Sequence, residues 1–207
     1  DTTPDVAAAL PVRVIRLKTH RQASYCRNVG ARGAKGEILA FIDSDCIAQP
    51  LWLMELVPAF REATVGIVGG RVSSFSSEEG LDRYEKVKSS LIVSSWFKRS
   101  SESEKHFYVP SCNMLVRKHL FMKIGGFKPE LSVGEDVDLC GRAQNEGFWV
   151  EYRPVGTILH RHRSRWSAFC MRRFQYGTSE PLLQQIHPDR HKTFLLPPWA
   201  FCYVVII

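Results

Sequence analysis

The feature that most constrains the fold is a short apolar run, Ile38–Ile42, which ends directly in Asp43-Ser44-Asp45. A continuous run of this kind predicts a strand buried on both faces of a sheet. Similar strand patterns alternate with helical ones along the chain. Strands are predicted at residues 12–16, 38–42, 65–72, 113–117, 148–152 and 157–160, and helices at 24–34, 50–60, 81–94, 119–124 and 136–145. This alternation predicts an α/β domain with a mixed, mostly parallel sheet flanked by helices.

Length and composition exclude several classes of protein. The chain has 207 residues, of which 44% are hydrophobic, enough to build a core and too many for a largely disordered chain. No run reaches the roughly 18 uncharged apolar residues of a complete membrane span, and no basic-then-apolar signal peptide opens the chain. The start at Asp1 and the uncharged run at residues 199–207 predict a piece of a longer protein.

The six cysteines show no C-x-x-C spacing, so the sequence does not support a zinc ribbon. Cys26, Cys46 and Cys140 fall inside predicted helices or at strand ends, among apolar neighbours. This placement favours free thiols in a reducing compartment over disulfides.

Two carboxylates, Asp43 and Asp45, stand where the predicted strand ends. Ligands of α/β sheets bind at the carboxyl ends of strands, and alternate side chains of an extended chain face the same way. The pair therefore suits a divalent cation that also contacts a diphosphate. A second D-x-D at residues 136–138 shows that the bare motif arises easily, so a purely structural role stays open.

A second acidic group, Glu135, Asp136 and Asp138, opens a predicted helix. Acids near a helix N-terminus are favourable because of the helix dipole, and the residues by themselves favour this capping role. A carboxylate at a helix start can also serve as a general base.

A basic segment begins at residues 160–166, His-Arg-His-Arg-Ser-Arg-Trp, and residues 161–173 contain five arginines. Arginine binds phosphate through paired hydrogen bonds. A nucleotide diphosphate, nucleic acid, an anionic membrane face and a merely solvated helix face are all compatible with this charge. A nucleic-acid surface would be broader, with aromatic platforms, so this class is disfavoured.

Taken in order, these segments resemble a family 2 glycosyltransferase with the GT-A fold. Residues 27–37 resemble the family's A-R-N-x-G…A-x-G-E segment, 41–45 its D-x-D strand, and Gly125-Gly126-Phe127 with Gly134-Glu135-Asp136 its G-G-F…E-D segment. The resemblance covers residues 1–177 and lacks the family's first strand and helix, and therefore half of its nucleoside pocket. Residues 178–207 are expected to be an amphipathic juxtamembrane segment that leads into a membrane helix.

A narrower resemblance concerns the glycosyltransferases of mycofactocin maturation clusters. It rests on Tyr108-Val109-Pro110-Ser111 and on residues 133–139, 176–179 and 186–188. Those enzymes are membrane-associated and extend a glucose chain on a peptide-derived redox cofactor.

The family resemblance implies inverting transfer from a nucleotide-sugar, expected to be a UDP-hexose such as UDP-glucose, to an acceptor hydroxyl. It implies that Mg²⁺ or Mn²⁺ is held by Asp45, Asp43 and His160, with His162 as the alternative to His160. It further implies that Asp1, Arg27, Asp43, Asp45 and Arg165 bind the donor, that Glu135 and Trp166 bind the acceptor, and that Asp136 is the base. Arg27 is expected either to contact phosphate or to pair with an acid of the D-x-D strand.

The partners implied are a UDP-sugar donor, an acceptor derived from a glycan, lipid or peptide, and the inner face of the cell membrane. Anchoring helices are expected beyond residue 207, and no nucleic acid is expected. Two other functions stay open. One is a nucleotidyltransferase of similar fold, and the other is a non-catalytic basic module that binds membranes.

Overall fold

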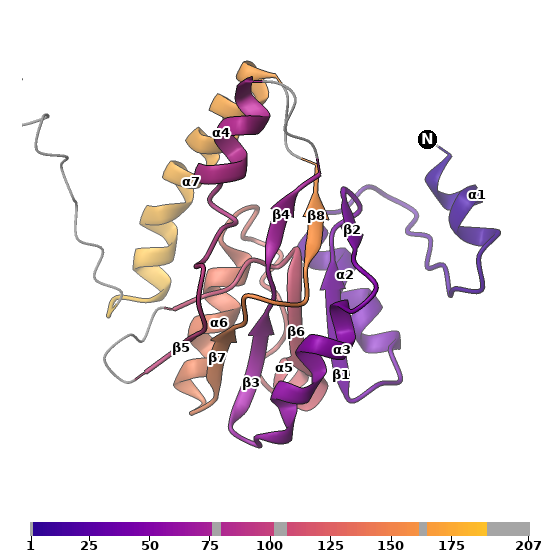
Figure 1. Cartoon of the computed structure of the whole chain (residues 1–207). Helices are drawn as coiled ribbons and strands as arrows, with labels where there is room; N and C mark the ends of the chain where they lie inside the picture. Colours follow the sequence, from indigo (N-terminus) through magenta and orange to yellow (C-terminus); the bar gives the residue numbers. More distant parts are fainter. Residues whose placement is uncertain (1, 76–79, 102–106, 162–164, 190–207) are drawn as a thin grey trace, which may run out of the picture.

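The computed structural model describes residues 2–75, 80–101, 107–161 and 165–189 (Figure 1). In chain order, the elements are α1 (Thr3–Ala8), α2 (Ala23–Gly33), β1 (Ile38–Ile42), β2 (Cys46–Ala48), α3 (Trp52–Leu56), the 3-10 helix η1 (Val57–Arg61), β3 (Val65–Gly69), β4 (Val72–Ser74), α4 (Gly80–Lys88), β5 (Lys98–Arg99), β6 (Asn113–Arg117), α5 (Lys118–Lys123), α6 (Glu135–Asn145), β7 (Trp149–Tyr152), β8 (Ile158–His160) and α7 (Trp166–Ile186).

The strands form two sheets that follow one another end to end (Figure 1). The larger sheet has the order β1-β6-β3-β7-β5, and the smaller one has the order β2-β8-β4. β1, β3 and β7 run in one direction, since β6 is antiparallel to both β1 and β3 and β7 is parallel to β3. These three strands lead along the chain into β2, β4 and β8. Their carboxyl ends therefore meet where the two sheets join.

The predicted α/β architecture with a mixed sheet is confirmed, but the larger sheet has fewer parallel pairs than expected. Only β3 and β7 pair in parallel among its described strands, and β5 is antiparallel to β7. The reversed strand β6 lies between β1 and β3, which makes both of its own pairings antiparallel. Although β1, β3 and β7 run in the same direction, only β3 and β7 are neighbours and form a parallel pair.

Helices cover both faces of the larger sheet. On one face, α2, α5 and α6 enclose the main core, in which Phe41, Phe121 and Phe127 pack with ring centroids 5.2–5.5 Å apart. On the other face, α3 and η1 cover a smaller cluster that contains Leu56 and Phe60. Successive side chains of β6 point alternately into these two cores, as the period of a strand requires.

The strand predicted at residues 12–16 is wrong, because this segment pairs with no strand in the described part of the chain. β1 consequently forms the edge of the described sheet. Its expected burial on both faces is not observed: Leu39 and Phe41 are buried, whereas Ala40 and Ile42 are exposed. The alternation is that of a strand with one covered face.

The helix predicted at residues 50–60 is divided into α3 and η1, as the late Pro58 led us to expect. Proline lacks an N–H and crowds the preceding turn, so the α-helix stops at Leu56.

Helix α7 continues without a break across residue 177, where the sequence predicted a domain boundary. Beyond that point, the buried Leu183 packs with Leu131 and Val137. Residues up to Ile186 therefore share a core with the preceding domain. Residues 190–207, where a membrane helix was expected, lie outside the described residues. None of the described helices combines the length and the apolar character that a bilayer crossing requires.

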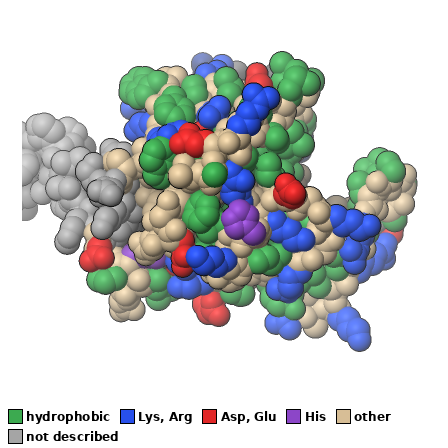
Figure 2. All heavy atoms as spheres, turned by 90° about the horizontal axis from the view of Figure 1, so that it is seen from below, with side chains coloured by type: hydrophobic (Ala, Val, Ile, Leu, Met, Phe, Trp, Pro, Cys, Tyr) green, Lys and Arg blue, Asp and Glu red, His purple; other side chains and the backbone are tan. Residues whose placement is uncertain are grey.

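The net charge of +7 is spread more widely than the basic segment after His160 suggested. Figure 2 shows Lys and Arg side chains dispersed over the face seen from below, among hydrophobic side chains. Helix α1 projects from the body of the molecule in both views.

Candidate active site

The junction of the two sheets is held by the buried side chain of Asn113, at the start of β6. Its amide nitrogen donates to the carbonyls of Arg71 and Gly156, both at 2.9 Å, and its oxygen accepts from the Trp52 indole at 2.7 Å. Gly70 lies in the same crossing, where a Cβ atom would come within 2.6 Å of the Asn113 amide nitrogen. The Asn113 side chain thus holds together the segments that follow β3 and β7.

A cleft of about 250 Å³ opens at this junction. Its walls come from the D-x-D turn, from α2, α4, α6 and α7, and from the loop before β6. Charged, polar and aromatic side chains line it, among them Arg27, Asp43, Asp45, Ser111, Glu135, Asp136, His160, Phe169, Arg172, Arg173 and Tyr176.

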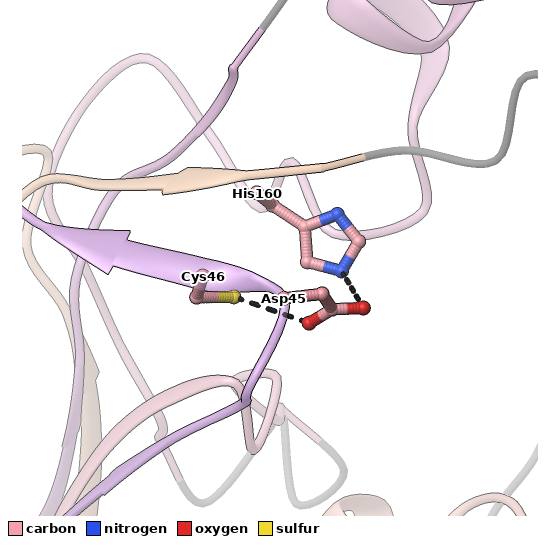
Figure 3. Close-up of side chains that lie close together, drawn as sticks. All are labelled: Asp45, Cys46 and His160. Carbon is pink, nitrogen blue, oxygen red and sulfur yellow. Dashed lines mark hydrogen bonds and ion pairs between the residues drawn. The ribbon is translucent and has the colours of Figure 1, made fainter. Parts of the chain in front are cut away.

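In the lining of the cleft, Asp45 and His160 face each other, with 3.6 Å between Asp45 Oδ2 and His160 Nε2 (Figure 3). Cys46 lies on the other side of the carboxylate, with its Sγ 3.6 Å from Asp45 Oδ1. One ligand atom from each of the three residues fits within 4.8 Å of the others, and no other such group occurs in the described part of the chain. Carboxylate and imidazole are both suitable ligands for a divalent cation, so these residues fit the expected metal.

Asp43 lies in the cleft but outside this three-residue group, because it forms an ion pair with Arg27. The guanidinium of Arg27 also bonds to Glu135, with 3.0 Å between Nη1 and Oε1, and it lies over the ring of Phe127. Of the two contacts predicted for Arg27, the structure shows the one with an acid of the D-x-D strand. Arg27 therefore links the D-x-D turn to the acidic start of α6.

Asp136, which also lines the cleft, lies in the first turn of α6, and Gly134 caps this helix with a φ of 84°. Its carboxylate accepts hydrogen bonds from the backbone N–H groups of Val137 at 2.8 Å and Ser111 at 3.3 Å. Burial, followed by the charge of the neighbouring Glu135, raises the pKa of Asp136 to about 7. The two roles predicted for Asp136 are therefore compatible. The same carboxylate accepts a hydrogen bond from the first turn of the helix and titrates near neutral pH, where a general base is effective.

The G-G-F and A-R-N-x-G segments are joined by the buried side chain of Asn28. Its amide nitrogen donates to the carbonyl of Phe127 at 2.7 Å, and its oxygen accepts from the Phe127 N–H at 2.9 Å. Gly126, with a φ of 71°, has no room for a side chain beside the Asn28 oxygen. This pairing positions α2, and therefore Arg27, against the loop that leads to α6.

Asp138 lies in the first turn of α6, as the capping role requires, but its carboxylate is also held by other side chains. Its side chain is fully buried and bonds to Arg142 at 2.9 Å, to Lys128 at 3.2 Å and to His187 at 3.0 Å. Burial by itself would raise the pKa of Asp138, but Arg142 and Lys128 hold it below its usual value. Asp138 thus ties α6 to the end of α7 and lies outside the lining of the cleft.

Two residues predicted to bind substrates, Arg165 and Trp166, do not line the cleft. The Trp166 side chain is 65% exposed and contacts Phe169, with ring centroids 5.9 Å apart. Asp1 and His162 lie outside the described residues, so their roles stay predictions.

Helix α7 instead directs four other side chains into the cleft: Phe169, Arg172, Arg173 and Tyr176. Arg172 and Arg173 belong to the basic segment for which a nucleotide diphosphate was one predicted ligand, whereas Phe169 and Tyr176 had no predicted role. A spacing of three, four and seven residues places all four on one helix face. That spacing is the signal that would have identified them. Ser111 and Cys46 were missed as well, and only contacts across the fold reveal them.

Comparisons with known proteins agree with this geometry. Residues 1–125 match the family described as Glycosyl transferase family 2. The chain is 31% identical over 189 residues to the "Pre-mycofactocin glycosyltransferase" of Mycobacterium tuberculosis, covering 89% of this chain and 40% of that protein. It is 28% identical over 158 residues to "Glycosyltransferase AglE" of Haloferax volcanii, covering 70% of this chain and 50% of that protein. The chain thus spans half or less of the length of these relatives.

Two solved structures show the same fold. The mannosyltransferase PcManGT from Pyrobaculum calidifontis, in complex with GDP-Man and Mn²⁺, has a TM-score of 0.63 at 19% identity and covers 96% of this chain and 54% of its own. S. aureus TarS in complex with UDP-GlcNAc has a TM-score of 0.60 at 18% identity, with coverage of 80% and 47%. With the family match over residues 1–125, these findings establish that the chain belongs to glycosyltransferase family 2 and has the GT-A fold.

Proposed function

We propose that this protein transfers a sugar from a nucleoside-diphosphate sugar to an acceptor hydroxyl, with inversion at the anomeric carbon. The observation that carries the proposal is that two chemically different groups line one cleft, and we name each an end of it for the substrate that it would hold. Asp45 and His160 form the cation-binding end. Asp136, with its pKa raised to about 7, forms the end that holds the general base. Such a cleft holds a diphosphate at one end and a reacting hydroxyl at the other.

At the donor end, Asp45 and His160 would hold Mg²⁺ or Mn²⁺, which would neutralise the charge of the diphosphate leaving group. Arg172 and Arg173 add fixed positive charge to the same cleft from α7. Because guanidinium groups bind phosphate oxygens in pairs, these two residues are suited to the diphosphate. We assign them the donor-binding role that the family resemblance implied for Arg165.

At the acceptor end, Asp136 takes the proton of the acceptor hydroxyl as the oxygen attacks the sugar. A base is most effective when its pKa lies near the working pH. Ser111 and Glu135 border this carboxylate, since the Ser111 hydroxyl donates to Glu135 at 3.1 Å while the Ser111 N–H donates to Asp136. A single attack by a deprotonated acceptor, without a covalent intermediate on the enzyme, inverts the configuration.

For the donor we favour UDP-hexose, and for the acceptor a hydroxyl of a mycofactocin-type or other membrane-proximal glycan. The support is the likeness to the mycobacterial relative, whose name gives pre-mycofactocin as its substrate. A structural neighbour was solved with a UDP-sugar and another with a GDP-sugar, so both classes belong in any test.

We also propose that the full-length protein docks on the inner face of the membrane through α7 and α4. These helices lie side by side, with Tyr84 against Phe169 and Arg173 bonded to Glu85 (Figure 1). They expose large apolar side chains, namely Val87 at 68%, Trp166 at 65%, Met171 at 57% and Phe174 at 68%. Apolar side chains flanked by arginines are typical of interfacial helices.

The membrane proposal is tested by flotation of the full-length protein with vesicles of anionic lipid. We expect Phe174→Glu to reduce the bound fraction, because it places a charge in the apolar surface. Met54→Glu on α3 is the matched control, since Met54 is 70% exposed on a different helix. Equal binding of both variants would contradict the role of α7.

The transfer proposal is tested with full-length protein, Mn²⁺ and a panel of UDP- and GDP-sugars, with nucleotide release as the readout. We expect one UDP-hexose to give acceptor-dependent release, and NMR of the product to show the inverted anomer. A retained anomer would refute the single-displacement mechanism. Release from no donor, together with vesicle binding, would favour the non-catalytic membrane module.

A further inference from the structure

Cys46 lies beside the two expected metal ligands, yet the proposed transfer reaction gives it no role. β2 and β8 are antiparallel, and their register places Cys46 directly opposite His160. Residues directly opposite in an antiparallel pair project from the same face of the sheet. The backbone therefore fixes the thiol and the imidazole on one face, with Asp45 immediately before the strand.

The Asp45 carboxylate lies between the Cys46 thiol and the His160 ring (Figure 3). The distance between Cys46 Sγ and Asp45 Oδ1 is 3.6 Å, and the distance between His160 Nε2 and Asp45 Oδ2 is also 3.6 Å. Ligand atoms held about 2.0–2.3 Å from a tetrahedral zinc ion lie roughly 3.5 Å from one another. The two distances to Asp45 are close to this value, and one ligand atom from each of the three residues lies within 4.8 Å of the others.

We propose that Cys46 is a third protein ligand of the metal centre and that its sulfur makes the site prefer thiophilic cations, such as Zn²⁺ and Co²⁺, over Mg²⁺. This inference deepens the metal centre of the proposed function and rests on it. Thiolate ligands favour zinc and related ions, whereas Mg²⁺ prefers oxygen ligands. On binding, the thiol releases its proton to solvent and a sulfur–metal bond forms, with no change of oxidation state.

A second thiol, Cys112, packs against Cys46 and is the nearest alternative source of sulfur. It is only 3% exposed, and it is absent from the group of ligand atoms that lie within 4.8 Å of one another. Cys46 is therefore the sulfur that faces the cation, and Cys112 supports it from the core.

Cobalt provides a direct test, because a thiolate bound to Co²⁺ gives a sulfur-to-metal charge-transfer band in the near ultraviolet. We expect this band when Co²⁺ alone is added to the full-length protein. It should be lost in Cys46→Ser and retained in Cys170→Ser, the matched control, since Cys170 is an exposed free thiol on α7. A wild-type spectrum without the band would overturn the proposal, as would a band that persists in Cys46→Ser or disappears only in Cys112→Ser.

Calorimetry with Zn²⁺ and Mg²⁺ supplies an independent readout. We expect Cys46→Ser to weaken Zn²⁺ binding at least as much as the loss of an outer-shell partner does, by roughly 10–100-fold, and to change Mg²⁺ binding little. Equal losses for both ions would indicate a general structural effect and refute the thiol preference. Circular dichroism of each variant checks folding, and Cys46→Ala serves as the second variant if the serine variant is unstable.

These readouts separate the metal inference from the proposed function. If nucleotide release is observed but no sulfur band forms, the protein is a transferase whose cation is bound without Cys46. If the band forms but no donor releases nucleotide, the thiol ligand stands and the transfer proposal fails.

Discussion

The two ends of the cleft use aspartates in opposite environments. Asp45 follows a strand, has a side chain that is 52% exposed, and faces an imidazole and a thiol. Asp136 begins a helix, is partly buried, and has a pKa raised to about 7. Exposure leaves Asp45 accessible to a cation, whereas burial beside Glu135 keeps a proton close to Asp136. In the proposed function, environment would thus give one residue type two roles, as in other enzymes with paired carboxylates.

The largest expected effect is on turnover in Asp136→Asn. We expect transfer to fall by about 10²–10⁴-fold, which is the usual contribution of a general base. Calorimetric binding of UDP with Mn²⁺ should stay close to the wild-type value, because the cation-binding end is untouched. Transfer near the wild-type rate would show that Asp136 is not the base and would break the contrast between the two ends.

The next effect concerns the cation-binding end. Asp45→Asn should weaken metal-dependent UDP binding by at least roughly 10–100-fold, since a ligand is lost and not merely an outer-shell partner. Asp43→Asn is the matched control. Its carboxylate pairs with Arg27 and is not part of the Asp45 group, so a smaller loss is expected. The assignment fails if the two variants lose affinity equally.

A pH profile sharpens the comparison further. The base form of Asp136 must be present for transfer, so activity should rise as pH increases through about 7. For one such group, we expect a roughly tenfold increase in transfer rate between pH 6 and pH 8. Metal-dependent UDP binding, measured over the same range, controls for effects at the other end. A flat rate profile would contradict the raised pKa.

The smallest effect is on stability. Because folding raises the pKa of Asp136 above its unfolded value, the folded state holds this proton more tightly. The wild-type protein should therefore lose stability as pH rises from about 4 through 7, and the loss stays constant above that range. Asp136→Asn removes this cost, so at pH 8 we expect its free energy of unfolding to exceed that of the wild type by at most roughly 4 kcal/mol, reduced by any hydrogen bonds that the amide makes less well.

Thermal unfolding of Asp136→Asn and of Asp45→Asn at pH 8 and pH 4 checks this expectation. The exposed Asp45 should give no comparable gain at pH 8. A loss of stability in Asp136→Asn at pH 8 would mean that the hydrogen bonds from Val137 and Ser111 outweigh the cost of the buried charge.

Local sequence predicted most elements of the larger sheet, because apolar runs and helix periods are decided by nearby residues. α2 and β6 lie within about a residue of their predicted bounds. The segment at residues 12–16 failed because a strand exists only with a neighbour to receive its hydrogen bonds. The direction of β6 was equally unpredictable, since pairing across the sheet depends on how distant segments meet.

For the site, the sequence by itself determined which carboxylates follow a strand and which begin a helix, and the ordered motifs indicated the family. Only the tertiary structure decided the partners of these residues. It paired Asp43 with Arg27, set Cys46 opposite His160, buried Asp138 against His187, and turned Arg172 and Arg173 into the cleft in place of Arg165. The physical reason is that charge, hydrogen bonding and burial act between atoms within a few ångströms, and the fold brings such atoms together from segments more than a hundred residues apart along the chain.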